Sequence, residues 1–199
     1  MIVSLPAARA TFLDEIDAGL DAVAVAVRRE FEPLDQELLT RRPKPGAWSV
    51  AHCLDHLRHT NAEYRTRLAP ALEEARRDGP SGGGRPEAGG TLRSNWFERW
   101  FVRWMAPGGG MAVKAPKIFQ PDEEPAGSDA VQGFLEEQGR LRELVAEARG
   151  LPVDRIKFGT PVTALLRLRV STAFALLLNH EVRHLEQARR ACAGVRGSP

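Results

Sequence analysis

Apolar residues recur every three or four positions along four segments of the chain, which is the period of an amphipathic helix. Pro33 ends the first segment, and Ser49, a favourable N-cap residue, opens the second. Gly150 and Gly194 follow the last two segments, as glycine commonly does at the end of a helix. An alternating strand pattern occurs nowhere in the sequence. The pattern predicts a bundle of four long helices, over 7–32, 49–77, 128–149 and 170–193.

The helical period breaks off between the second and third segments, over 78–127. This insertion begins with DGPSGGGRPEAGG, whose glycines and prolines are typical of a flexible loop. A short helix is predicted within it, over 95–105, where Trp96, Trp100 and Trp104 recur at fourfold spacing on one face. We expect this tryptophan stripe to pack over the bundle. The alternative interpretation is a wall on which a substrate stacks.

The charge of the chain is nearly balanced, with 28 Lys and Arg against 26 Asp and Glu and a formal net charge of +2. The arginines form no basic run with interleaved aromatic residues, so we expect no nucleic-acid partner. The longest apolar stretch elsewhere, 173–178, is far shorter than a membrane span, and the N-terminal residues lack a basic leader. Cys53 and Cys192 share no paired spacing, which indicates free thiols. We therefore expect a cytoplasmic protein without a membrane partner.

All five histidines lie on the second and fourth predicted helices. Because each residue advances a helix by about 100°, His56 lies beside the apolar stripe of its helix, whereas His52 is rotated toward the polar side. His180 and His184 are four residues apart and share one face, as a metal-chelating pair requires. We predict that His56, His180 and His184 bind one divalent metal ion inside the bundle, with His52 as a reserve ligand. The alternative is that these histidines are solvated surface residues.

Glu181 falls near the middle of the apolar stripe of the fourth helix, between Leu177 and Leu185. A buried carboxylate needs a partner, because an unpaired buried charge is costly. One interpretation is structural, with a salt bridge to an arginine or a hydrogen bond to a Trp or Tyr. The other makes Glu181 a candidate catalytic residue, which orients a ligand histidine or acts as a general base.

Four motifs of the chain resemble those of the DinB-like (DNA-damage-inducible) family. The segment RPKPGAWSVAHCLDHL (42–57) resembles the start of the family's second helix, and NHEVRHLEQARR (179–190) resembles its last-helix signature, His-x-x-Arg-His-x-x-Gln. Between them, KAPKIFQP (114–121) and the helical segment FLEEQGRLRELV (134–145) are also similar. The resemblance extends from about residue 30 to residue 190.

The resemblance implies a bundle that binds a metal ion through one histidine of the second helix and two of the last, here His56, His180 and His184. We therefore predict an all-α, up-down-down-up-type four-helix bundle in one domain, 1–199, with a long irregular insertion that carries a short extra helix. Three imidazoles leave coordination positions open to water and substrate, and imidazole suits zinc, nickel or iron.

Two classes of function follow from this predicted site. The first is an enzyme that acts on a small molecule, either a metal-dependent hydrolase or a low-molecular-weight-thiol-dependent transferase, as the resemblance implies. The second is a non-enzymatic metal-binding stress-response protein. The resemblance also implies a homodimer.

Overall fold

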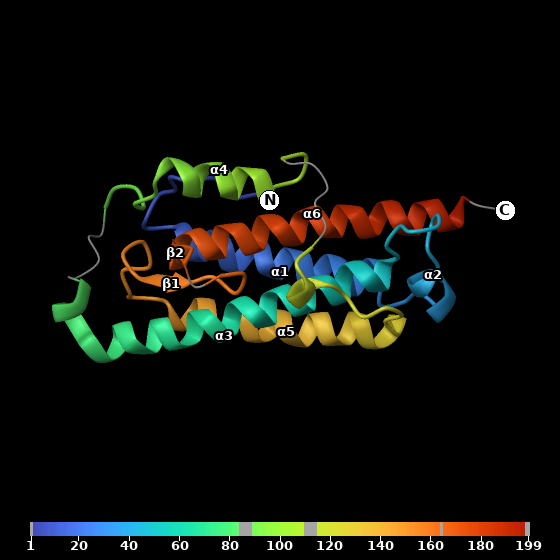
Figure 1. Cartoon of the computed structure of the whole chain (residues 1–199), viewed down its shortest axis with the longest axis horizontal. Helices are drawn as coiled ribbons and strands as arrows, with labels where there is room; N and C mark the ends of the chain where they lie inside the picture. The colour runs from blue at the N-terminus through green and yellow to red at the C-terminus, as the bar shows by residue number, and fades with distance from the viewer. Residues whose placement is uncertain (1, 84–88, 110–114, 164, 198–199) are drawn as a thin grey trace.

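Four long helices lie side by side in the computed structural model, which describes residues 2–83, 89–109, 115–163 and 165–197 (Figure 1). A short helix, α2, packs at one end of them. The predicted helical bundle is confirmed. The helices are α1 (Phe12–Glu30), α2 (Gln36–Thr40), α3 (Val50–Gly83), α5 (Gly127–Glu147) and α6 (Val170–Arg196).

The two central helices of the sequence, α3 and α5, run in the same direction. Near their middles, the Arg65 guanidinium donates to the Glu137 carboxylate at 2.6 Å. Further along both helices, Arg76 donates to the Glu147 carbonyl at 2.8 Å. The helices α1 and α6 run the opposite way (Figure 1). The predicted up-down-down-up order of the four helices is therefore confirmed.

This topology explains the length of the insertion between α3 and α5. Antiparallel neighbours can be joined by a short turn, but parallel neighbours require a connection that returns along the bundle. Since α3 has 34 residues, the return path is about 50 Å long. The returning chain forms α4 (Trp96–Met105) and the 3-10 helix η1 (Lys117–Phe119).

The predicted boundaries of the insertion need one correction. The helix α3 continues to Gly83, so the loop expected from residue 78 begins later. Adding residues to the end of an existing helix requires no new nucleation step. The free-energy cost of the additional helical residues is therefore small. Residues 84–88 and 110–114 of the predicted irregular segments lie outside the described residues.

The prediction that the chain contains no strand is wrong. A small antiparallel hairpin precedes α6, formed by β1 (Lys157–Gly159) and β2 (Arg167–Arg169). Its central pair, Phe158 and Leu168, is buried, whereas the residues around that pair are more exposed. Three residues are too few for an alternating pattern to stand out in a sequence.

The core of the bundle is formed by the apolar stripes that the sequence predicts. Phe12, Ile16 and Leu20 of α1 are at most 1% exposed and pack with Phe134 of α5 and Phe174 of α6. Gly19 brings α1 close to α6, because a Cβ atom there would lie 2.5 Å from a Leu178 methyl carbon.

The tryptophan stripe of α4 does not pack over the bundle as we expected. Trp96 and Trp100 are 72% and 52% exposed, and Trp104 is partly exposed. The opposite face of α4 packs inward instead, through Val102 and Glu98. Fourfold spacing identified a shared helical face, but a different face of α4 points inward. That face carries the ion pair of Glu98 and the apolar side chains of Val102, Phe97 and Phe101.

Glu98 anchors α4 to the start of α6. Its carboxylate is 2% exposed, forms an ion pair with Arg169, and accepts hydrogen bonds from the backbone N–H groups of Asn95 and Arg169. The Asn95 side chain in turn accepts from the Glu98 backbone N–H, which completes a capping box.

We predict that Glu98→Ala lowers the free energy of unfolding by about 3 kcal/mol, because it leaves the Arg169 charge without its buried partner. Urea unfolding followed by circular dichroism measures this loss. The matched control is Glu136→Ala, which removes an exposed ion pair to Arg140 and should cost less than about 1 kcal/mol. Equal losses in the two variants would show that Glu98 does not anchor α4.

Candidate metal centre

Three histidine rings from two antiparallel helices meet inside the bundle. His56 projects from the first third of α3, and His180 and His184 project from one face of α6. The centroid of the His56 ring lies 5.0 Å from that of His180 and 4.5 Å from that of His184. His56 and His180 are 3% and 6% exposed, and His184 is partly buried. The structure thus brings together the three residues selected from the sequence.

The orientation of His56 is set by a backbone group. Its Nδ1 atom is hydrogen-bonded to the carbonyl oxygen of Phe119, the last residue of η1. Because a carbonyl oxygen can only accept, Nδ1 carries the proton and Nε2 keeps its lone pair. A contact of this kind fixes the tautomer of a metal-binding histidine.

The distance between ring nitrogens fits a shared cation. Nε2 of His56 lies 3.2 Å from Nε2 of His180. Two imidazole nitrogens on a tetrahedral zinc ion, each about 2.0–2.1 Å from the metal, are separated by about 3.3 Å. The Nδ1 atom of His184 is buried and has no hydrogen-bond partner among the described residues. Buried polar nitrogens normally have a partner, so this set of donors fits a divalent cation.

The rings are neutral at physiological pH. Burial lowers the pKa of His56 to about 4 and that of His184 to about 3. Burial also places the pKa of His180 well below its ordinary value, and the neighbouring His184 and His56 lower it further. Only neutral imidazole can donate a lone pair to a metal ion, so these residues need not lose protons before they bind one.

Trp48 covers the histidines from the side and was not identified from the sequence as a site residue. Its ring centroid lies 4.9 Å from that of His56 and 5.7 Å from that of His184. Trp48 belongs to the turn-rich segment just before α3, within the motif RPKPGAWSVAHCLDHL. Its large apolar ring shields two of the three imidazoles from water.

Glu181 lies in the core next to this cluster in sequence but is not a member of it. Its two carboxylate oxygens accept hydrogen bonds from the side-chain amides of Asn61 at 2.8 Å and Gln138 at 2.7 Å. The partners that we expected, an arginine, Trp or Tyr, are therefore wrong. Burial raises the pKa of Glu181 to about 8, although both amide bonds lower it.

The other two histidines have different surroundings. His52, the reserve ligand, is hydrogen-bonded through Nδ1 to Ser49 and through Nε2 to Arg42, and lies outside the triad. His59 lies near Asp55 and Asp122 in a second group of possible ligands. The positive charge beside that group is already supplied by a side chain, because the Arg58 guanidinium donates to Asp55 at 2.6 Å.

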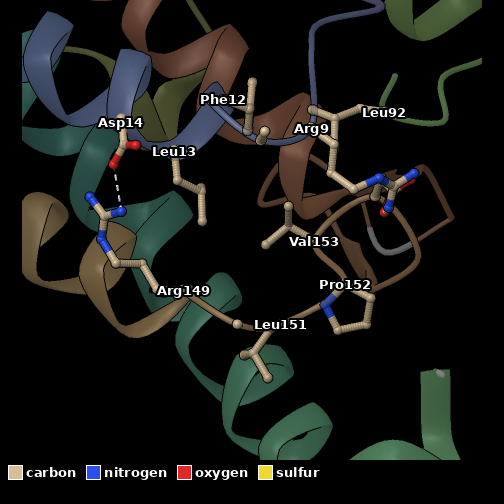
Figure 2. Close-up of a pocket in the computed structure, with 12 residues that line it drawn as sticks. Arg9, Phe12, Leu13, Asp14, Leu92, Arg149, Leu151, Pro152 and Val153 are labelled. Atoms are coloured by element: carbon tan, nitrogen blue, oxygen red, sulfur yellow. Dashed lines mark hydrogen bonds and ion pairs between the residues drawn. The ribbon is translucent and has the colours of Figure 1, made fainter. Parts of the chain in front are cut away.

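A cavity of about 190 Å³ lies at the other end of the bundle, where α1 begins and α5 ends (Figure 2). Arg9 and Arg149 line it, and each already has an acidic partner, Asp154 and Asp14 respectively. None of the three clustered histidines lines this cavity.

The architecture and the buried histidine cluster define a helical-bundle protein with a candidate metal centre. A family model described as the DinB superfamily matches residues 20–188. The chain therefore belongs to the DinB superfamily. None of the curated proteins compared with the chain matches it.

Among solved structures, the chain is similar to YfiT from Bacillus subtilis, described as a probable metal-dependent hydrolase with an unusual four-helix bundle topology. The TM-score is 0.57 at 14% sequence identity, and the match covers 94% of this chain and 89% of that one. At this identity, the likeness shows a shared fold.

The lowered histidine pKa values predict that zinc binding at pH 6 displaces few protons from the triad, fewer than about 0.5. Three solvated histidines with ordinary pKa values would release roughly two protons at that pH. Calorimetric titrations in two buffers of different ionisation enthalpy measure the number released. The same titrations on the Glu181→Gln variant exclude any proton released by the neighbouring buried carboxyl group. A release of two protons in that variant would contradict the buried, neutral triad.

Proposed function

We propose that this chain is a metal-dependent hydrolase whose divalent cation is bound by His56, His180 and His184. The observation that carries the proposal is the convergence of three neutral imidazoles, from two helices, at one buried point. The description of YfiT as a probable metal-dependent hydrolase, together with its similar fold, supports the same chemistry here.

A cation bound by three imidazoles supplies a Lewis acid that polarises a carbonyl or phosphoryl oxygen of a substrate. The residues of the chain prepare that position. Phe119 holds the His56 tautomer through its carbonyl oxygen, and Trp48 limits the access of water to His56 and His184. A site with three protein ligands leaves a coordination position for a small-molecule substrate.

The contacts of Glu181 favour a positioning role for this residue. Asn61 on α3 and Gln138 on α5 hold its carboxyl group, and Gln138 also donates to the Leu20 carbonyl of α1. These bonds fix the rotation of α6 against three helices, and that rotation directs His180 toward α3. The proton-accepting role of Glu181 stays a prediction.

The identity of the metal, the type of reaction, the location and the oligomeric state are also parts of the proposal. Zinc, nickel and iron all suit imidazole ligands, and transfer to a low-molecular-weight thiol uses the same kind of Lewis acid as hydrolysis. We expect cytoplasmic homodimers that act on a small molecule. A turnover assay must therefore include ester, amide and thiol-adduct substrates.

We predict that His184→Ala abolishes stoichiometric metal binding and lowers hydrolysis at least about 100-fold, because two imidazoles hold a divalent cation poorly. Metal content after dialysis and turnover on the substrate panel measure the two effects. His52→Ala is the matched control and should keep both properties, since His52 lies outside the triad. Equal metal in both variants would place the site elsewhere. Stoichiometric metal without turnover on any substrate would leave a non-enzymatic metal-binding protein.

We predict that Glu181→Leu lowers the free energy of unfolding by about 3 kcal/mol and weakens zinc binding about tenfold, because two buried amides lose their acceptor. Glu181→Gln should restore both, since Asn61 can turn its own buried and unpaired Oδ1 toward the new amide group. Chemical unfolding and zinc titration measure the two quantities. If Glu181→Gln instead loses hydrolysis at least 100-fold with its zinc retained, Glu181 is a proton acceptor rather than a positioning residue.

A further inference from the structure

The outward face of α4 carries a continuous row of aromatic rings. Trp96 and Trp100 are exposed, and the rings of Trp100 and Trp104 are stacked with their centroids 6.1 Å apart. Phe97 and Phe101 lie beside this row and are partly buried against the core, with ring centroids 6.0 and 6.5 Å from that of Trp100. Exposed aromatic side chains that adjoin one another in this way commonly mark a surface that binds a protein, a ligand or a membrane.

The charged side chains on the outward face of α4 are all positive. Arg99 and Arg103 are exposed, lie one turn apart on α4, and flank the tryptophans, and Arg93 is exposed just before the helix. Glu98, the one acidic residue in the sequence of α4, points inward and is neutralised by Arg169. Among the residues of α4, the outward face therefore offers tryptophan rings beside guanidinium groups and no carboxylate.

We infer that the outward face of α4 binds the surface of an anionic phospholipid bilayer. Tryptophan favours the boundary between lipid headgroups and acyl chains, where its ring is buried and its N–H stays hydrated. Arginines beside it attract anionic headgroups, and an interfacial helix has this combination of residues. This inference differs from the expectation from the sequence, which was that the protein has no membrane partner.

The geometry favours a flat, acidic occupant over a second copy of the chain. In a two-fold dimer the same patch faces itself, which would bring Arg99 and Arg103 close to their own counterparts. The helix α4 lies on the outside of the bundle (Figure 1), and a bilayer can accommodate an outer helix without a groove. Across the described residues, no helix is both long and apolar enough to traverse a bilayer, so the association proposed is peripheral.

Co-sedimentation of the full chain with vesicles tests the inference. Vesicles of phosphatidylcholine with 30% phosphatidylserine should bind the protein, and vesicles of phosphatidylcholine alone should bind it at least about tenfold more weakly. Trp96→Ala combined with Trp100→Ala should lower the partition coefficient about tenfold or more. Arg99→Glu combined with Arg103→Glu should abolish binding to the anionic vesicles, and 0.5 M salt should weaken the native interaction.

Leu165→Ala is the matched control, because Leu165 is an apolar side chain that is 95% exposed outside α4. It should bind vesicles as the native chain does, and all variants should unfold at the native temperature, since the substituted side chains are exposed. The inference fails if the native chain does not sediment, if both vesicle types bind equally, or if Leu165→Ala matches the tryptophan variant. It also fails if the native chain is a dimer that the tryptophan substitutions dissociate, which would assign the face to a second copy.

Discussion

The structure depends on a buried polar contact among three helices, in which the carboxyl group of Glu181 is held between the amides of Asn61 and Gln138. Apolar packing alone specifies the position of α6 less sharply, because apolar side chains can repack in several ways with little loss of stability. Hydrogen bonds in a medium of low polarity are directional and expensive to leave unmade. This contact therefore selects one rotation and one height of α6, and with them the position of the histidines.

The parallel arrangement of α3 and α5 has a second consequence. It requires a long connection, and that connection supplies parts of the candidate site that the four long helices cannot supply. The Phe119 carbonyl that orients His56 comes from η1 on the returning chain. The helix α4 comes from the same connection and covers the outer side of α6 (Figure 1). The insertion is thus part of the architecture and of the candidate centre.

Much of the fold and of the candidate site could be predicted from the sequence, because both depend on helical spacing. The period of apolar residues located the four helices, and angular position selected His56, His180 and His184. The parts that could not be predicted depend on contacts between distant segments. The Phe119 contribution comes from a backbone carbonyl, which leaves no signature in the side-chain sequence. Glu98 is buried on the inward face of α4 by its contact with Arg169, which is 71 residues away in the sequence.

Three successive residues of α6 link these features, since each step of about 100° around the helix faces a different neighbour. The Asn179 amide bonds to the backbone of Val3 and to the Val102 carbonyl of α4. His180 faces His56 on α3, and Glu181 faces the contact with Asn61 and Gln138 in the core. A shift of α4 would therefore act directly on the helix that carries two of the three clustered imidazoles. The helix α4 and the candidate metal centre are therefore both attached to α6, within two residues of each other along its sequence.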